Sequence, residues 1–279
     1  MSTWHAFNPV LVLSGAVICS ASESNEPLAR GIQDNSFLVE EAYNQEPGVV
    51  QHILNIPLSF TSGHKELPAT FTQEWPVFSQ LHQFSYTIPY THTENGRSEN
   101  NFEDVRLNYR LQALMEDERT PAFAPRFSLV LPTGDAEKGF GHDRLGYEIN
   151  LPFSKIVGER WTINFNSGGS IFPDVKDHDL TNFNLGGSAI YAVSRDLNLM
   201  LESVAFWEED VDSARKVDHT VIALVSPGAR YAFNLPNDAQ LVVGLALPIG
   251  LTSDSPDWGL FFYCSFEHRF APTKARRLK

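Results

Sequence analysis

Hydrophobic and polar positions alternate with a period of two along most of the chain beyond residue 48. In the stretch Trp161–Asn166, for example, large apolar residues alternate with threonine and two asparagines. Successive side chains of a β-strand point to opposite faces, so this pattern is typical of strands with one apolar and one polar face. The pattern predicts an all-β protein with about twelve strands, at 49–60, 68–75, 80–90, 103–113, 122–132, 145–153, 161–171, 181–193, 197–207, 219–233, 239–251 and 259–270.

The connections between these predicted strands alternate between short and long. The short set comprises 76–79, 114–121, 154–160, 194–196 and 234–238, and the long set comprises 61–67, 91–102, 133–144, 172–180, 208–218 and 252–258. Outer-membrane barrels have an even number of antiparallel strands, with short periplasmic turns and longer external loops. The sequence therefore predicts a single antiparallel transmembrane β-barrel over residues 49–270, in the outer membrane of a bacterium. The alternative is a secreted β-sandwich or a soluble barrel.

The aromatic residues at the strand ends fit the same interpretation. Trp75 and Trp161 fall beside short connections, whereas Trp207 and Trp258 fall beside long ones. Tryptophan favours membrane interfaces, so these four residues are expected to form two aromatic girdles in contact with lipid. The last predicted strand alternates apolar residues and ends at Phe270, a form of closing strand that resembles the signal read by the barrel-assembly machinery. A basic tail, 271–279, follows it.

Two segments precede the predicted barrel. The apolar stretch Pro9–Ile18, followed by small residues, resembles a secretory signal peptide that is cleaved after Ala21, although no basic residue comes before it. Residues 22–48 form an N-terminal segment, in which the span 32–48 is predicted to be a short helix that begins near Asp34 and ends at Pro47 and Gly48. Its acidic residues are suited to inward-facing arginines. It is therefore expected either to plug or cover the barrel or to lie outside its mouth.

Composition narrows the choice of function. The 279 residues are 42% hydrophobic and 20% charged, with a net charge of −13. An acidic chain without basic clusters is a poor partner for nucleic acid, because phosphates are neutralised by lysine and arginine. After the first 20 positions no apolar run is long enough for a membrane-spanning helix. Of the two cysteines, Cys19 lies in the predicted signal peptide and Cys264 in the last strand, so no disulfide is expected.

The polar faces of the strands supply the candidate functional residues. The residues expected to line the lumen are Arg106, Arg110, Arg126, Glu148, Asn150, Asn164, Asn166, Asn184, Glu202, Arg230, Glu267 and Arg269. Side chains of both signs in a pore select solutes by charge and size, whereas the same side chains paired across the lumen would close it. The acidic loops do not match a calcium-binding loop, and the scattered histidines do not form a metal site. We expect no catalytic residues, cofactor or metal.

Several segments of the chain resemble those of a known protein family. The stretches Asn35–His52, Phe71–Pro76, His82–Tyr90, Arg126–Asp135 and Gly146–Lys155 resemble a bacterial family named for the MetA pathway of phenol degradation. The resemblance runs over roughly residues 32–270. It implies an outer-membrane barrel of porin-like or transport character, and its label points weakly to phenol as a solute. The resemblance identifies no functional residue in this chain.

These observations predict a channel for the passive passage of a small solute, aromatic or otherwise hydrophobic, through the outer membrane. The first alternative is a barrel without conductance that has a structural or partner-binding role. The second is an enzyme, because His92–Ser98 resembles the His-x-Ser-Asn-Gly segment of the outer-membrane phospholipase. Glu94 stands at the position of the serine nucleophile, so this mechanism would have no attacking hydroxyl. The sequence does not indicate the oligomeric state of the protein.

Overall fold

The computed structural model describes residues 26–270 except 33, 62–63, 95–97 and 212–214. The strands are β1 (Val49–Thr61), β2 (His64–Val77), β3 (Ser79–Glu94), β4 (Ser98–Phe102), β5 (Arg106–Leu111), β6 (Ala122–Phe123), β7 (Arg126–Val130), β8 (Gly146–Val157), β9 (Trp161–Val175), β10 (His178–Ala192), β11 (Leu197–Val211), β12 (Val217–Leu235), β13 (Ala239–Ala246), β14 (Ile249–Gly250) and β15 (Trp258–Arg269). Two short 3-10 turns, η1 (Leu28–Arg30) and η2 (Ala136–Lys138), accompany them.

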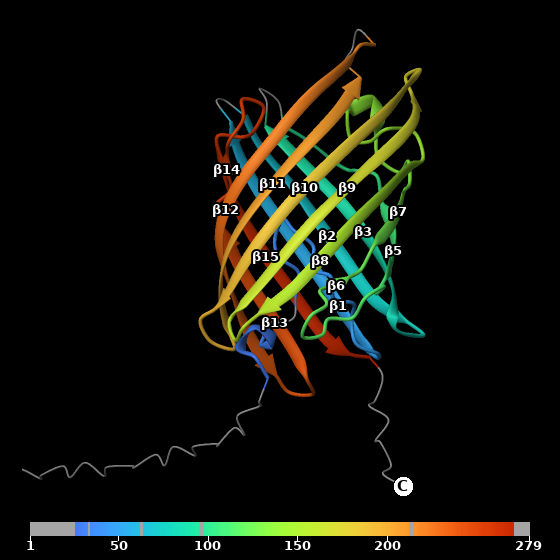
Figure 1. Cartoon of the computed structure of the whole chain (residues 1–279). Helices are drawn as coiled ribbons and strands as arrows, with labels where there is room; N and C mark the ends of the chain where they lie inside the picture. Colours follow the sequence, from blue (N-terminus) through green and yellow to red (C-terminus); the bar gives the residue numbers. More distant parts are fainter. Residues whose placement is uncertain (1–25, 33, 62–63, 95–97, 212–214, 271–279) are drawn as a thin grey trace, which may run out of the picture.

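The sheet closes on itself into a barrel (Figure 1). The first strand, β1, pairs antiparallel with the last, β15, from Val49 opposite Arg269 to Phe60 opposite Trp258. Within the described residues the ring contains twelve strands, and the short pieces β4, β6 and β14 pair beside it. The predicted closed, twelve-stranded antiparallel barrel is therefore confirmed. Closure removes the free strand edges that would otherwise expose unpaired backbone groups to lipid.

The barrel is apolar outside and polar inside. On β9, Phe165 is 46% exposed on the outer face, whereas its neighbours Asn164 and Asn166 are buried on the inner face. Large apolar side chains are exposed in the same way on the outer positions of most strands. A water-soluble protein would have the opposite arrangement, so this exterior fits hydrocarbon. No helix in the described part of the chain is long and apolar enough to cross a membrane.

The N-terminal segment differs from the prediction. The helix expected over 32–48 is wrong: the part of the segment that the structure describes has no helix beyond η1, and its chain is irregular. The reason is that barrel side chains replace the helix's own hydrogen bonds. The N–H groups of Leu38 and Val39 donate to Glu202, and that of Ala42 donates to Ser154. A helix of this length is marginal in water, so these tertiary contacts decide its conformation.

The remaining expectations about segments fall into two groups. The signal peptide over 1–21 and the basic tail over 271–279 lie outside the described residues. Within them, the long connections predicted at 61–67, 91–102, 172–180 and 208–218 are largely strand. At 91–102, β4 forms a hairpin extension on β3, and at the other three the strands continue past the bounds predicted for them. Of the four tryptophans expected in the girdles, Trp75, Trp161 and Trp258 lie near strand ends on outer positions. Trp207 is also on an outer position, but β11 continues beyond it to Val211.

Candidate functional site: the lumen and the segment inside it

Glu40 of the N-terminal segment lies at the centre of a charged cluster. Its carboxylate accepts hydrogen bonds from Nε of Arg126 and Nη1 of Arg110, each at 2.9 Å, and from the amide of Asn150 at 2.7 Å. Arg126 also donates from Nη2 to Glu148 at 2.7 Å, and Nε of Arg106 lies 3.7 Å from the other oxygen of Glu148. The side chains of β5, β7 and β8 therefore form a chain of alternating charge that includes one residue from the segment.

A second cluster holds the beginning of the segment. Arg230, on β12 and almost fully buried, donates to the backbone carbonyls of Asp34 and Asn35 and to the carboxylate of Glu41 at 3.1 Å. The carboxylate of Asp34 accepts hydrogen bonds from side chains of β1 and β15, namely Gln51, Tyr263 and Ser265. A buried charge is tolerated only when it is paired and hydrogen-bonded, and this cluster provides both.

Polar side chains of the wall also bind the backbone of the segment. Asn166 accepts from the N–H of Glu40 and donates to its carbonyl oxygen. Gln112 accepts from the N–H of Asn44 and donates to the carbonyl of Ala42. Further along, the N–H of Gln45 donates to Gln83. The irregular backbone of the segment is thus satisfied without secondary structure.

An aromatic anchor complements these polar contacts. The ring of Phe37 stacks on Phe261 with centroids 5.5 Å apart and lies 5.1 Å from the ring of Tyr263. It fits against two glycines of the wall: a Cβ atom at Gly244 would lie 2.3 Å from Cζ of Phe37, and one at Gly228 would lie 3.0 Å from Cε2. Glycine at both positions gives the ring room against the backbone.

The segment fills only part of the lumen. Inward residues toward the short-turn end, such as Asn164, Glu202 and Ser226, are buried. Inward positions nearer the long loops are half-exposed on β10, β11 and β12, and they include Asn182, Asn184, Phe206, Ile222 and Leu224. Val130, Phe172 and Leu180, at the long-loop ends of β7, β9 and β10, are instead buried in an apolar cluster. The side chain of Arg106 is 35% exposed and that of Glu148 is 22% exposed. Solvent therefore reaches the charged layer from the long-loop side. The part of the lumen on this side of Glu40 is called the upper lumen below.

One long loop packs over part of the upper rim. Asp104 accepts hydrogen bonds from the backbone N–H groups of Gly134 and His142, both at 2.9 Å, and its oxygen lies 3.1 Å from Nδ1 of His142. The imidazole of His142 stacks on Phe172 at 3.7 Å. Burial works against ionisation of Asp104, but these hydrogen bonds outweigh it and lower the pKa of the carboxyl.

The structure places the predicted lumen residues in three groups, with Asn184 apart from them. Arg106, Arg110, Arg126, Glu148 and Asn150 belong to the charged cluster around the Glu40 side chain, whereas Asn164, Asn166, Glu202 and Arg230 hydrogen-bond to the backbone of the segment or to Ser36. Asn184 has its amide oxygen beside Gly168 in the upper lumen. The third group lies toward the short-turn end of β15: Glu267 is on an inner position, and Arg269 pairs at the rim with Glu46 and Asp238.

The sequence reasoning missed several residues that hold the segment. Gln51, Gln83 and Gln112 occupy polar positions of the alternation, and this signal could have identified them. Tyr263 could not be found in this way, because it looks like an apolar member of the last strand. Within the described residues, no three histidine, cysteine, aspartate or glutamate side chains are grouped so that they could hold a metal ion.

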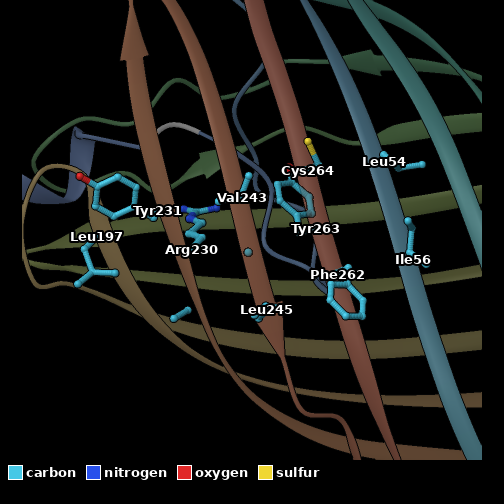
Figure 2. Close-up of a pocket in the computed structure, with 12 residues that line it drawn as sticks. Leu54, Ile56, Leu197, Arg230, Tyr231, Val243, Leu245, Phe262, Tyr263 and Cys264 are labelled. Atoms are coloured by element: carbon cyan, nitrogen blue, oxygen red, sulfur yellow. The ribbon is translucent and has the colours of Figure 1, made fainter.

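The outer face carries an apolar groove of about 520 Å³ across β11, β12, β13, β15 and β1 (Figure 2). Leu54, Leu245, Phe262 and the free cysteine Cys264 are among its lining residues. Along each strand these residues alternate with residues whose buried side chains point into the lumen. The groove therefore lies on the outside of the barrel.

The comparisons with known proteins support the fold. The sequence matches no protein-family profile and no curated protein. Among solved structures, the chain is similar to the COG4313 outer membrane channel from Pseudomonas putida F1, with a TM-score of 0.62, 12% identity, and coverage of 86% of this chain and 100% of that chain. It is also similar to the KdgM porin in complex with disordered oligogalacturonate, with a TM-score of 0.42, 8% identity, and coverage of 80% and 99%. The closed sheet with its apolar exterior is that of an outer-membrane β-barrel.

Proposed function

We propose that this protein is an outer-membrane channel for the passive passage of a small solute, with a lumen that the N-terminal segment closes in the conformation described above. The observation that carries the proposal is the charged layer around Glu40, which solvent reaches from the long-loop side. A lumen with a purely structural role has no need of solvent-accessible arginines and glutamates of both signs. The fold of the COG4313 channel is consistent with this role.

The segment would act as a plug in the axial path. It is held by ion pairs and hydrogen bonds to side chains, which are noncovalent, and it adds no strand to the sheet. Its displacement toward the short-turn end would leave the barrel wall intact and would expose Arg110, Glu202 and Arg230 to the lumen. The solute class that the family resemblance implies, aromatic or otherwise hydrophobic, is part of this proposal.

Single-channel recording in planar bilayers tests the proposal. The full chain is expected to give small or intermittent conductance, and a variant without residues 32–48 is expected to give larger, stable conductance. Deletion of the basic tail 271–279 serves as the control, because it removes residues that follow the last strand, β15, in the sequence. Absence of conductance in both the full chain and the 32–48 deletion would contradict the proposal and would favour the structural or partner-binding alternative.

A phospholipase-like enzyme is the weaker alternative. His92 lies 3.7 Å from Glu94, which stands at the position of the nucleophile, and residues 95–97 lie outside the described residues. A carboxylate cannot replace the serine hydroxyl as the attacking group in that mechanism.

The proposal includes the route by which the chain reaches the membrane. Residues 1–21 would be removed as a signal peptide, and Phe270 at the end of the last strand would be read by the barrel-assembly machinery. The intact mass of the purified protein tests the first point, since it should correspond to a chain that begins at residue 22.

A further inference from the structure

The carboxylate of Glu40 occupies a site that is built from side chains of the barrel wall. One of its oxygens accepts a hydrogen bond from Nη1 of Arg110 at 2.9 Å. The other accepts from Nε of Arg126 at 2.9 Å and from the amide of Asn150 at 2.7 Å. The three donors lie on β5, β7 and β8, and the register places Arg110 opposite Arg126 and Arg126 opposite Asn150. Together they match a planar group with two charged oxygens.

Arg126 and Asn150 are oriented toward this carboxylate. Arg126 also donates from Nη1 to the wall residues Asn108 and Ser128, so its position does not depend on Glu40 alone. The side-chain oxygen of Asn150 is buried without a hydrogen-bond partner among the described residues. Its amide nitrogen thus donates to the carboxylate although the oxygen stays unpaired, which is unfavourable by itself. Donors that are oriented in advance bind a carboxylate at a lower entropic cost.

The charges of this cluster balance only while a carboxylate fills the site. Within the part of the chain that the structure describes, a series of ion pairs with N···O distances of 2.7 to 3.8 Å links Arg106, Glu148, Arg126, Glu40, Arg110 and Glu74. It contains three guanidinium groups and three carboxylates. Withdrawal of Glu40 would leave three positive charges against two negative ones, and an uncompensated buried charge is strongly unfavourable. A monoanion would restore the balance, whereas a neutral molecule would not.

The site is reached from the upper lumen. The side chains of Glu40 and Arg126 are partly exposed, whereas that of Arg110 is buried. Arg106 and Glu148, which are nearer the long loops, are more exposed. A solute that enters from the long-loop side would therefore meet Arg126 before the deeper Arg110.

An apolar surface lies along the same row of inward positions. The register continues from Asn150 through Gly168, Asn184 and Phe206 to Ile222, with one residue on each strand from β8 to β12. Neighbouring strands are roughly 4.8 Å apart, so Phe206 is about 14 Å along the wall from Asn150. Gly168 contributes no side chain to this row, and Phe206 and Ile222 are half-exposed. A solute whose apolar body extends several atoms from its carboxylate would contact both the charged and the apolar part of the row.

We propose that Arg110, Arg126 and Asn150 form a binding site for the carboxylate of a solute, and that Glu40 occupies this site when no solute is bound. The solute is a monocarboxylate with an extended apolar body, such as an arylalkanoate, and the body contacts Phe206. By replacing Glu40 it removes the ion pairs that join the segment to β5 and β7, so its binding favours release of the segment. The inference rests on the channel function proposed above, and it adds the class of solute and the contact through which the solute acts on the plug.

Isothermal titration calorimetry of the full chain in detergent tests the site. The probe is 4-phenylbutanoate, and its uncharged amide, 4-phenylbutanamide, is the matched ligand. Glu40 competes with the probe in the wild-type protein, so Glu40→Ala is expected to bind 4-phenylbutanoate about tenfold more tightly, with unchanged affinity for the amide. Glu46→Ala is the control and should bind like the wild type, because Glu46 belongs to the same segment but pairs with Arg269 at the rim.

A second substitution tests the wall. In the Glu40→Ala protein, Arg126→Gln should abolish the gain in affinity for 4-phenylbutanoate and leave the affinity for the amide unchanged. Equal affinities for 4-phenylbutanoate in the wild type and in Glu40→Ala would overturn the proposal. An equal gain for the amide would overturn it as well, because the gain would then come from added space and not from the vacated charge.

Single-channel recording separates this inference from the channel itself. In the wild-type protein, 4-phenylbutanoate should raise the open probability and the amide should not. If the protein conducts but 4-phenylbutanoate neither binds nor changes the open probability, the carboxylate site is wrong and the channel stands. If Glu40→Ala binds the probe as expected but neither the full chain nor the 32–48 deletion conducts, the binding site is supported and the channel is wrong.

Discussion

The carboxylate of Glu40 lies 2.9 Å from Nε of Arg126, although 86 residues separate the two in the chain. Glu40 belongs to the segment inside the barrel and Arg126 belongs to the wall. Because Arg110 shares the same carboxylate, one residue of the segment pairs with two guanidinium groups of the wall. Glu40 therefore links the segment to two strands, β5 and β7, by charge.

Replacing this carboxylate should loosen the segment. Glu40→Gln leaves Arg110 and Arg126 without their common partner, and breaking a buried ion pair in this way costs about 3 kcal/mol. We expect a higher open probability in single-channel recordings. Glu46→Gln is the matched control, because Glu46 is 59% exposed and pairs with Arg269 at the rim at 3.4 Å. Equal open probabilities in the two variants would mean that the ion pairs do not hold the segment.

The glycine beside Phe37 provides a steric test. In Gly244→Ala the new methyl group would lie 2.3 Å from the Phe37 ring, so the ring must leave its position. We expect faster cleavage of the segment by trypsin at Arg30 in folded, detergent-solubilised protein. Gly187→Ala is the control, since its methyl group would meet nothing closer than 3.8 Å. Cleavage at the wild-type rate in Gly244→Ala would contradict the packing of Phe37 against the wall.

The loop held by Asp104 should respond to acid. The pKa of Asp104 is lowered in the folded loop from its ordinary value of 3.8, so its carboxylate contributes stability above pH 3.8 that is lost as the pH falls through the lowered value. Hydrogen exchange of the amides of Gly134 and His142 should stay slow at pH 5 and become faster, relative to the intrinsic rate, only below pH 3.8. In Asp104→Asn, exchange should already be fast at pH 5. A wild-type profile for this variant would show that another contact fixes the loop.

The two faces of β9 should tolerate different substitutions. Phe165→Arg places a charge on the lipid-facing side and should reduce the free energy of unfolding in bilayers by about 2–4 kcal/mol. Asn164→Ser, on the adjacent inner position, should have a much smaller effect, because its side chain forms one long hydrogen bond to Ser36 at 3.4 Å. Denaturant titration of the folded barrel measures both. A similar loss for the two variants would exclude the assigned orientation of β9.

The thiol of Cys264 should react from lipid and not from water. It is a free cysteine on the outer face of β15, in the apolar groove beside Phe262 and Leu54. In membranes, a membrane-permeant maleimide should label it, whereas a charged maleimide should label it only after denaturation. Rapid labelling by the charged reagent in the membrane would place this part of the groove in water.

The sequence predicted the barrel because its signal is local. The alternation that puts Phe165 outside and Asn164 inside is contained in a few consecutive residues. The lengths of the connections were predicted less well, because strands such as β9 and β10 continue to a turn at residues 176–177. The path of the N-terminal segment was not predictable in this way. Its capping residues favoured a helix, but the partners of Leu38 and Val39 lie on a strand more than 160 residues away.

The segment also gives this barrel a check on its own assembly. A polar lumen offers few shape constraints, so a strand that slips by one residue would turn its inner side chains toward lipid and lose its contacts with the segment. Residues 34–45 bind side chains from strands all around the ring, from Gln83 on β3 to Glu202 on β11 and Ser265 on β15. The contacts with the segment can therefore all form only when distant strands have the correct register relative to one another. The segment thus favours the correctly aligned barrel over one with a shifted strand.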